Sequence, residues 1–374
     1  MTMNVIDLFC GTGGFSHGFA QTGEFNVLLG LDIRQQSVDT FAANHRSAIG
    51  ICDDIRNVKL ETLAERIGGA PVDVIIAGPP CQGFSSIRPF RSINENDPRN
   101  TLYEQVLVFV DFFKPKFLVF ENVVGMLHHD RGRTISAVAQ SFEALGYSVG
   151  VEALNSVCFG VPQKRERVIV LGRRGEIPPY FPAPKHRFNG RSMAAAKHAT
   201  KSFPLFSQDL PPAITVADAI FDLPPVGAGE GATEYCPNPS GSDYANARRK
   251  GCDVLTLHSS TGHRPRMLDI IRQAGKNRWA LPAGLTTSGF SSCYSRLSAD
   301  EPSTTITVNF VHPASNRCIH PIQDRALTPR EGARLQSFDD DFVFCGSRTQ
   351  IVKQIGEAVP PLLGRAIAEA LLQQ

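Results

Sequence analysis

The chain has 374 residues, of which 42% are hydrophobic, with 32 glycines and 26 prolines. This length and composition support a large core in two lobes or domains, which excludes disordered, fibrous and collagen-like proteins. Lysine and arginine number 38 against 36 aspartate and glutamate, and this net charge of +2 does not by itself indicate a nucleic-acid-binding protein. The middle of the chain differs, because residues 185–300 hold 14 basic and 9 acidic residues, whereas 1–184 hold 17 and 19 and 301–374 hold 7 and 8.

Two further absences narrow the class of protein. No apolar run approaches the roughly 18 residues of a membrane-spanning helix, and the N-terminus lacks the pattern of a signal peptide, so we expect a soluble, cytoplasmic protein. The nine cysteines are odd in number and form no CxxC pair. This argues against a disulfide scaffold and a zinc knuckle, and we expect free thiols and no metal site.

In the first half of the chain, short apolar runs alternate with helix-like stretches, a pattern typical of a parallel sheet covered by helices on both faces. The predicted strands are residues 4–9, 27–31, 48–52, 72–77, 117–120 and 168–171. A helix is predicted over 102–113, because Leu102, Val106, Phe109 and Phe113 recur at helical spacing on one face.

The second half differs in its proline content and in its apolar patterning. Of the 26 prolines, 11 fall between residues 177 and 239, where periodic apolar segments are few. Phenylalanines in the same stretch still provide apolar side chains to bury, so we expect a loop-rich second domain and not a linker. Near the end, Pro360 and Pro361 precede an amphipathic pattern that predicts a final helix.

The first predicted strand runs into a glycine turn at residues 10–14 (CGTGG). Such a turn lets a ligand approach the backbone, although a tight strand-to-helix turn alone also explains it. Asp32 ends the second strand 21 residues after Gly11, where a carboxylate can accept from ribose hydroxyls, and Asp54 follows the third strand and could accept from an adenine amine. Each aspartate alone is more often a solvated loop residue. Together they favour an adenosine-containing ligand, and the absence of GxGxxG argues against a dinucleotide.

The fourth strand leads into residues 78–85 (GPPCQGFS). Pro79 and Pro80 hold the backbone rigid before Cys81, and the polar stretch to Asn100 follows as a loop. This arrangement suits a thiolate nucleophile under a closing loop. The alternative is a buried structural cysteine.

Six blocks of the sequence together resemble the DNA cytosine 5-methyltransferases of bacterial restriction-modification type. They are residues 7–14, 78–85, 121–123 (ENV), 163–167 (QKRER), Arg296 with 301–307 (EPSTTIT), and 356–361 (GEAVPP). The resemblance implies the fold of an S-adenosylmethionine-dependent methyltransferase, a Rossmann-like mixed α/β sheet with helices on both faces, plus a smaller target-recognition domain. We expect the catalytic and cofactor-binding domain to comprise 1–184 and 346–374, and the recognition domain 185–345.

The resemblance also implies a mechanism. Carbon 5 of cytosine is too weak a nucleophile to take a methyl group until a nucleophile adds at carbon 6, and Cys81 would be that nucleophile. Glu121 would share or donate a proton at ring nitrogen 3 and the exocyclic amine. Arg167 would reach the cytosine carbonyl oxygen, with Arg165 in support and Pro80 holding the cysteine loop.

The implied methyl donor is S-adenosyl-L-methionine. Phe9 would stack on its adenine, Gly11 and Gly13 would admit the methionine portion, and Asp32 would take the ribose. The other residues implied at this site frame the adenine or close the pocket. They are Ile33, Asp54, Ile55 and Leu102.

The implied substrate is double-stranded DNA at a short specific sequence, with the target cytosine flipped out of the duplex. Basic residues of the uncovered middle region would form the second wall of a DNA cleft, with base readout from loops such as 285–294. They are Arg187, Arg191, Lys197, Lys201, Arg248, Arg249, Lys250, Arg264, Arg266, Lys276 and Arg278. We expect a monomer, and whether a cognate restriction endonuclease acts separately beside it stays open.

Two alternatives to this function remain. A structured RNA such as tRNA could be the substrate of the same chemistry, although the recognition region of some 120 residues favours DNA. A catalytically silent DNA-binding relative would carry a broken cysteine or glutamate motif, whereas Cys81, Glu121 and Arg167 are all intact.

Overall fold

The computed structural model describes residues 2–80, 102–188, 190, 209–236, 241–282, 284–286 and 289–374. Cys81 therefore lies outside the described residues, as do Arg191, Lys197 and Lys201. The chain forms two compact units. The first comprises Met1–Asn155, Glu166–Leu210 and Pro361–Gln374, and the second comprises Ser156–Arg165 and Pro211–Pro360.

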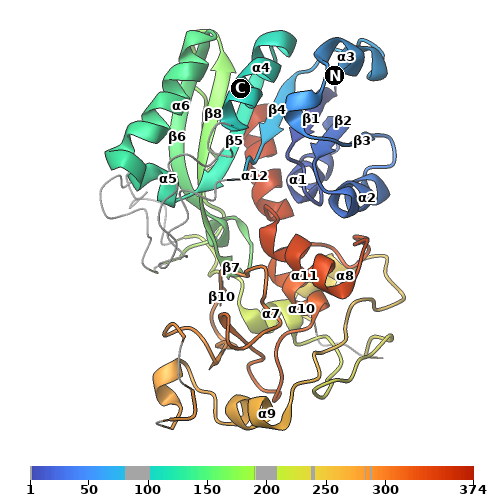
Figure 1. Cartoon of the computed structure of the whole chain (residues 1–374), viewed down its shortest axis with the longest axis vertical. Coiled ribbons are helices and arrows are strands. Elements are labelled where there is room, and N and C mark those ends of the chain that lie inside the picture. The colour runs from blue at the N-terminus through green and yellow to red at the C-terminus, as the bar shows by residue number, and fades with distance from the viewer. Residues whose placement is uncertain are drawn as a thin grey trace. The chain divides into compact units, whose positions relative to one another are not determined.

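The first unit is built on a seven-stranded mixed sheet with strand order β3-β2-β1-β4-β5-β8-β6 (Figure 1). Strands β3, β2, β1, β4 and β5 are parallel, and β8 runs antiparallel to both β5 and β6. The strands are β1 (Met3–Leu8), β2 (Phe25–Asp32), β3 (Ile49–Cys52), β4 (Val74–Ala77), β5 (Phe117–Val123), β6 (Tyr147–Asn155) and β8 (Glu166–Arg174). The predicted mixed α/β fold class is confirmed, and all six predicted strands are present.

Helices cover both faces of this sheet. The helices of the first unit are α1 (Gly14–Ala20), α2 (Gln35–Asn44), α3 (Leu60–Arg66), α4 (Leu102–Phe113), α5 (Gly125–His128), α6 (Arg133–Ala144) and α12 (Pro361–Leu372). One large apolar core joins α3, α4 and α6 to alternate residues of the sheet, such as Ile6 and Leu8. This alternation follows from the two-residue period of a strand, which sends neighbouring side chains to opposite faces. On the opposite face, Phe41 of α2 packs with Val27 and Cys10.

The last helix of the chain packs on the first. A side chain at Gly18 of α1 would lie 2.1 Å from the Pro361 carbonyl oxygen, and one at Gly364 of α12 would lie 2.6 Å from the Phe15 carbonyl oxygen. Each glycine therefore admits the backbone of the other helix at a distance that no other residue allows. This contact completes the first unit with the C-terminal end of the chain.

The second unit has little regular structure. Its elements are β7 (Gln163–Lys164), α7 (Val216–Ile220), α8 (Asp243–Arg249), α9 (Pro265–Arg272), β9 (Ser295–Arg296), β10 (Ser303–Thr304), β11 (Arg317–Ile319), α10 (Pro329–Leu335) and α11 (Arg348–Glu357). The residues that the structure describes also include four short 3₁₀ turns. They are Ile55–Asn57, His129–Gly132, Ser156–Phe159 and Arg278–Ala280. As predicted, loops make up most of this region.

Ion pairs, and not only apolar side chains, hold the second unit together. Arg325 donates to both carboxylate oxygens of Glu331 at 2.8 and 2.6 Å, and Arg334 bridges Asp222 and Asp340. These side chains are buried almost completely. Burial, the largest single influence, would raise the pKa of Glu331, but the hydrogen bonds from Arg325 and the positive charges around it together lower that pKa to about 2. Removal of one partner would leave a buried unpaired charge, so the network fixes α10 rigidly.

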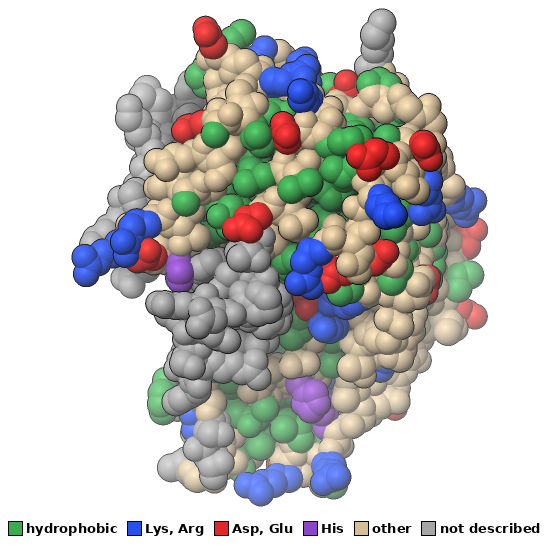
Figure 2. Space-filling view, turned by 45° about the horizontal axis from the view of Figure 1, so that its top comes forward, with side chains coloured by type: hydrophobic (Ala, Val, Ile, Leu, Met, Phe, Trp, Pro, Cys, Tyr) green, Lys and Arg blue, Asp and Glu red, His purple; other side chains and the backbone are tan. Residues whose placement is uncertain are grey.

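The surface of the first unit carries charges of both signs. In the view of Figure 2, acidic and basic side chains intermingle over the upper part of the molecule, in keeping with the 17 basic and 19 acidic residues of 1–184. Among the described residues, no helix is both long and apolar enough to cross a membrane.

Candidate active site

The segments that sequence analysis selected converge at one edge of the sheet. Because β2, β1, β4 and β5 are parallel neighbours, their carboxyl ends meet at that edge, the usual place for ligands in open α/β sheets. Four segments lie at these ends. They are Asp32, the glycine turn after Leu8, residues 78–80, and Glu121 with Asn122.

Glu121 and Arg167 form an ion pair at this edge. The two residues lie on the antiparallel strands β5 and β8, and Arg167 Nε is 2.8 Å from Glu121 Oε1. Their side chains are only 11% and 15% exposed, so the pair is partly shielded from water. Burial lowers the pKa of Arg167 below its ordinary value, and Glu121 counteracts this shift. The arrangement places a carboxyl group and a guanidinium side by side, suited to the hydrogen-bonding edge of a planar base.

The backbone that leads to Cys81 passes close to this pair. A side-chain carbon at Gly78 would lie 3.4 Å from Glu121 Oε2, so a larger residue there would press on the carboxyl group. Asn122, which is buried, donates from Nδ2 to the Pro79 carbonyl oxygen at 3.3 Å. Pro79 is buried and Pro80 exposed. Asn122 thus ties β5 to the approach to the cysteine, a role that sequence analysis missed because it arises only when the strands pair.

The glycine turn after β1 is held in an unusual backbone conformation. Phe9, Gly11 and Gly13 have positive φ angles of 58°, 52° and 79°. Such an angle is costly for phenylalanine and is typical of functional sites. Behind the turn, a side chain at Gly13 would meet the His45 ring at 2.9 Å. Burial lowers the pKa of His45 to about 4, so this ring is neutral near pH 7.

Asp32 fastens the turn to β2. Its Oδ2 accepts from the backbone N–H of Gly11 at 3.0 Å, and its Oδ1 accepts from that of Arg34 at 2.9 Å. A carboxylate offers about four acceptor sites, so two bonds leave capacity for ribose hydroxyls. Asp32 therefore shapes the turn in addition to the ribose contact expected from sequence.

The other residues expected at the cofactor have different environments. Ile33 is 65% exposed just after β2, so its apolar surface is accessible to a planar ligand. Ile55 and Leu102 are buried in the core of the first unit. Both oxygens of Asp54 accept from the Arg56 guanidinium, at 2.9 and 2.5 Å. These hydrogen bonds lower the pKa of Asp54 to about 2, and an adenine amine would have to share its carboxylate with Arg56.

Two buried side-chain oxygens fit the requirement for a polar ligand near the turn. Asp7 Oδ2 and Thr12 Oγ1 have no hydrogen-bond partner among the described residues. Native proteins rarely leave such groups unsatisfied, so each of them calls for a partner. At Gly11 of the same turn, the space where a side chain would begin is open for 4 Å. The residues at this turn therefore fit a ligand that carries polar groups.

Gln163 and Arg165 act within the second unit. Arg165 donates to the carbonyl oxygens of Ile306, Gly356 and Glu357 at 3.2–3.3 Å. Gln163 is fully buried. It donates to Gln336 Oε1 at 2.8 Å and accepts from the Ile306 N–H at 2.8 Å. Through these contacts the two side chains hold the backbone of Ile306, Gly356 and Glu357 in place.

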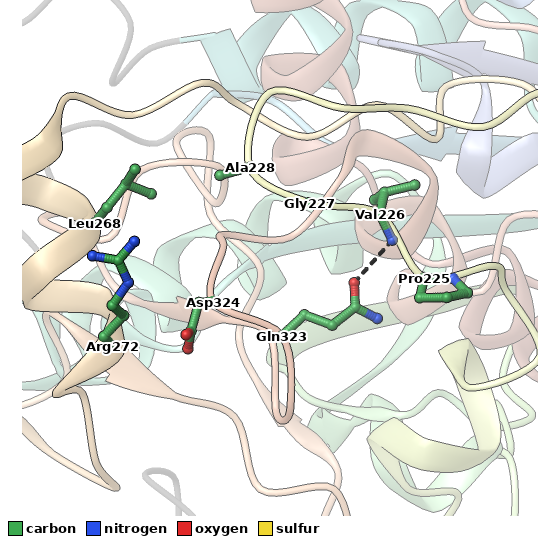
Figure 3. Close-up of a pocket in the computed structure, with 8 residues that line it drawn as sticks. All are labelled: Pro225, Val226, Gly227, Ala228, Leu268, Arg272, Gln323 and Asp324. Carbon is green, nitrogen blue, oxygen red and sulfur yellow. Dashed lines mark hydrogen bonds between the residues drawn. The ribbon is translucent and has the colours of Figure 1, made fainter.

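A pocket of about 450 Å³ lies in the second unit and contains none of the expected site residues (Figure 3). The loop at Val226 and Gly227 faces Leu268 and Arg272 of α9, with Gln323 accepting from the Val226 N–H at 3.1 Å. The remaining lining residues are Pro225, Ala228 and Asp324. The pocket holds no arrangement for nucleophilic or acid–base chemistry.

Comparison with known proteins agrees with this geometry. The sequence model of the family "C-5 cytosine-specific DNA methylase" matches residues 3–373. The chain is 36% identical to the Type II methyltransferase M1.HphI of Haemophilus parahaemolyticus, over 100% of this chain and 87% of that protein. It is 34% identical to the Type II methyltransferase M.AgeI of Thalassovita gelatinovora, over 99% of both chains.

Solved structures share the fold over the whole chain. A structure described as a DNA modification methyltransferase encoded within an E. coli prophage has a TM-score of 0.75 at 23% identity, covering 100% of this chain and 99% of that one. The Dnmt2 methyltransferase of S. pombe has a TM-score of 0.60 at 15% identity, over 100% and 98%.

The fold, the site and the matched sequence define a DNA methyltransferase class. The chain belongs to the C-5 cytosine-specific DNA methylase family, and it is a DNA (cytosine-5-)-methyltransferase.

Proposed function

We propose that this enzyme methylates carbon 5 of a cytosine flipped out of a specific sequence in double-stranded DNA, through a covalent bond between Cys81 and carbon 6. S-Adenosyl-L-methionine, bound along the carboxyl ends of β1 and β2, would supply the methyl group. The observation that carries the proposal is the ion pair of Glu121 and Arg167 beside the Gly78–Pro80 backbone that leads to Cys81.

In this scheme Cys81, Glu121 and Arg167 have different tasks. The Cys81 thiolate adds to carbon 6, and the electron pair moves through the ring to carbon 5 and nitrogen 3. Glu121 supplies or shares the proton that neutralises nitrogen 3, while Arg167 donates to the carbonyl oxygen at carbon 2 and holds Glu121 in place. After methyl transfer to carbon 5, loss of the carbon 5 proton expels the thiolate and restores the aromatic ring. The partly shielded ion pair strengthens both hydrogen bonds, because water competes less there.

The glycine turn and Asp32 would bind the methyl donor. Phe9 and Ile33 supply apolar surface for the adenine, Gly11 and Gly13 leave room for the methionine portion, and Asp32 retains acceptor capacity for the ribose. Asp7 and Thr12 would satisfy polar atoms of the donor with their unpartnered oxygens. Asp54, Ile55 and Leu102 would complete the adenine pocket.

The context of a restriction-modification system is part of the proposal. The relatives named above are Type II methyltransferases, which favours a modification enzyme with a restriction endonuclease acting separately. We expect the enzyme to act as a monomer, with residues 1–184 and 346–374 catalytic and 185–345 recognising the target sequence.

Bisulfite sequencing tests the proposal directly. The wild-type chain and Cys81→Ser are expressed in a host without cytosine methylation, and host DNA and tRNA are both converted and sequenced. We expect 5-methylcytosine at one short DNA sequence with the wild type and none with Cys81→Ser. Methylation confined to tRNA would establish the RNA alternative, and equal methylation by both variants would overturn the covalent scheme.

A further inference from the structure

The basic excess of the middle region is concentrated in one stretch of the second unit. Residues 264–296 contain six basic residues and one acidic residue, Asp269. This excess of five equals that of the whole region 185–300, so the rest of the region is balanced. Arg264 and Arg266 begin α9, Lys276 follows it, and all three side chains are exposed.

Arg278 does not share this exposure, because its donors bind the following loop. Its Nε donates to Thr286 Oγ1 at 3.2 Å, and its Nη1 donates to the Gly289 carbonyl oxygen at 2.5 Å. The Arg278 N–H also donates to the Ser291 carbonyl oxygen at 3.0 Å. Arg278 thus contacts Thr286, Gly289 and Ser291, and its guanidinium is committed to the protein and not to a phosphate.

Trp279, directly after this anchor, is the only tryptophan of the chain and is 74% exposed. Phe290, between the Arg278 partners Gly289 and Ser291, is 52% exposed. Tryptophan is usually well buried, and large exposed aromatic side chains on a fixed backbone mark interaction sites. The Arg278 guanidinium lies 5.5 Å from the centre of the Trp279 ring, an attractive distance that restrains the ring.

We propose that Trp279 is the aromatic base contact of the recognition domain, which packs on exposed base surface of the target duplex while neighbouring cations bind phosphates. This inference rests on the proposed function, which supplies DNA as the partner. Charge complementarity favours DNA, because Trp279 belongs to the basic stretch 264–296, which also carries the exposed cations Arg264, Arg266 and Lys276. Phosphates attract the cations without regard to sequence, and aromatic rings bind the apolar parts of bases.

The single tryptophan gives a direct optical test. Emission excited at a wavelength that tyrosine hardly absorbs reports on Trp279 alone. We expect a duplex containing the site mapped by bisulfite sequencing to quench this emission, and S-adenosylmethionine alone to leave it unchanged. The free protein should emit at the long wavelength of a hydrated indole. A short-wavelength emission that depends on protein concentration would mean that a second copy covers Trp279, and would overturn the proposal.

Affinity measurements on variants complete the test. Base stacking on an aromatic residue predicts that Trp279→Ala binds the mapped duplex roughly tenfold more weakly, that Trp279→Phe retains most of the affinity, and that both bind S-adenosylmethionine normally. Tyr180→Ala is the matched control, because Tyr180 is an exposed aromatic residue (62%) of the first unit. It should bind DNA like the wild type.

Failure of this inference can be told apart from failure of the proposed function. If the wild type methylates DNA, but duplex leaves the emission unchanged and Trp279→Ala binds normally, the role of Trp279 is wrong and the function stands. If the wild type methylates no DNA, the proposed function fails and the DNA contact fails with it.

Discussion

Arg165 and Arg167 lie two residues apart, and their guanidinium groups have quite different partners. Arg167 pairs with the Glu121 carboxylate, whereas Arg165 binds three backbone carbonyl oxygens. A carboxylate partner suits a residue that must meet a base, and carbonyl partners suit a residue that fixes a loop. From the motif alone, only the family resemblance separates the role expected of Arg167 from that of Arg165. Their different contacts give a physical reason for that separation.

Glu121→Gln tests the proposed proton transfer. The amide keeps the size of the side chain but cannot donate a carboxyl proton, so single-turnover methyl transfer should slow by about 10²- to 10⁴-fold. Affinity for S-adenosylmethionine should stay unchanged, because none of its proposed contacts lies on β5, which carries Glu121. Rapid-quench measurement of labelled methyl transfer to DNA gives the rate, with the exposed Glu143→Gln as control. An unaltered rate in Glu121→Gln would refute the proton role.

Two buried groups at the glycine turn predict opposite pH dependences of stability. Burial raises the pKa of Asp7 from 3.8 to about 7 and lowers that of His45 from 6.5 to about 4. Between pH 4 and 6.5, folded Asp7 holds a proton that the unfolded chain releases, so its contribution to the unfolding free energy falls as pH rises. Folded His45 lacks a proton that the unfolded chain binds, so its contribution rises. Each slope is about 1.4 kcal/mol per pH unit, and the two nearly cancel.

Single substitutions should separate these contributions. Relative to the wild type, Asp7→Asn should gain stability as pH rises from 4 to 6.5, and His45→Gln should lose it. Urea unfolding at several pH values in this window provides the measurement. Three parallel stability profiles would show that neither group titrates as its burial predicts.

Asp7, Asn122 and His45 show where residue-level sequence analysis stops. Asp7 and Asn122 belong to two of the motif blocks, 7–14 and 121–123, but the motifs alone assign neither residue a role. Asn122 gains its function by donating across strands to Pro79, and His45 by packing behind Gly13. Contacts between residues far apart in the chain carry no local signal, so only a resemblance or a structure can reveal them.

At the level of elements, apolar patterning located the buried strands and missed an edge strand. The six predicted strands are rich in buried Val, Ile, Leu and Phe. Strand β6 (Tyr147–Asn155) pairs only with β8 in the described sheet, and most of its side chains are half-buried. It therefore lacks the continuous apolar run that marks a strand buried on both faces. The antiparallel direction of β8 was likewise invisible, because direction depends on the connection and not on composition.

Helix packing between α1 and α12 gives a prediction about stability. Gly18→Ala would place a methyl group 2.1 Å from the Pro361 carbonyl oxygen, so the helices must separate. We expect a loss of about 1–3 kcal/mol in unfolding free energy, although alanine favours a helix by about 1 kcal/mol over glycine. Urea unfolding measures the loss. Because Gly364→Ala forces the same separation, the double variant should lose less than the sum of the two single losses, and strict additivity would contradict a shared contact.

For the whole molecule, the distribution of charge is more informative than its sum. The net charge of +2 gives no sign of a DNA-binding protein, and the first unit carries mixed charges. The positive excess lies in residues 264–296, and all of its basic residues except Arg296 fall in the region that the motifs do not cover. Composition could therefore indicate which part binds phosphates. It could not distinguish Arg278 or Arg248, whose guanidinium groups bind Thr286 and Asp339, from the exposed Arg264 and Arg266.

Salt dependence of DNA binding tests whether Arg264 and Arg266 bind phosphates while Trp279 contacts bases. In wild type, each cation that neutralises a phosphate adds about 0.9 to the slope of log affinity against log salt concentration. Arg264→Ala with Arg266→Ala should lower that slope by about 1 to 2, and should weaken binding to specific and nonspecific duplexes equally. Trp279→Ala should instead reduce the ratio of the affinity for the specific duplex to the affinity for the nonspecific duplex. Arg131→Ala with Arg133→Ala removes the same charge from the first unit and serves as control. A slope equal to that of the wild type in the Arg264 and Arg266 variant would place the phosphate contacts elsewhere.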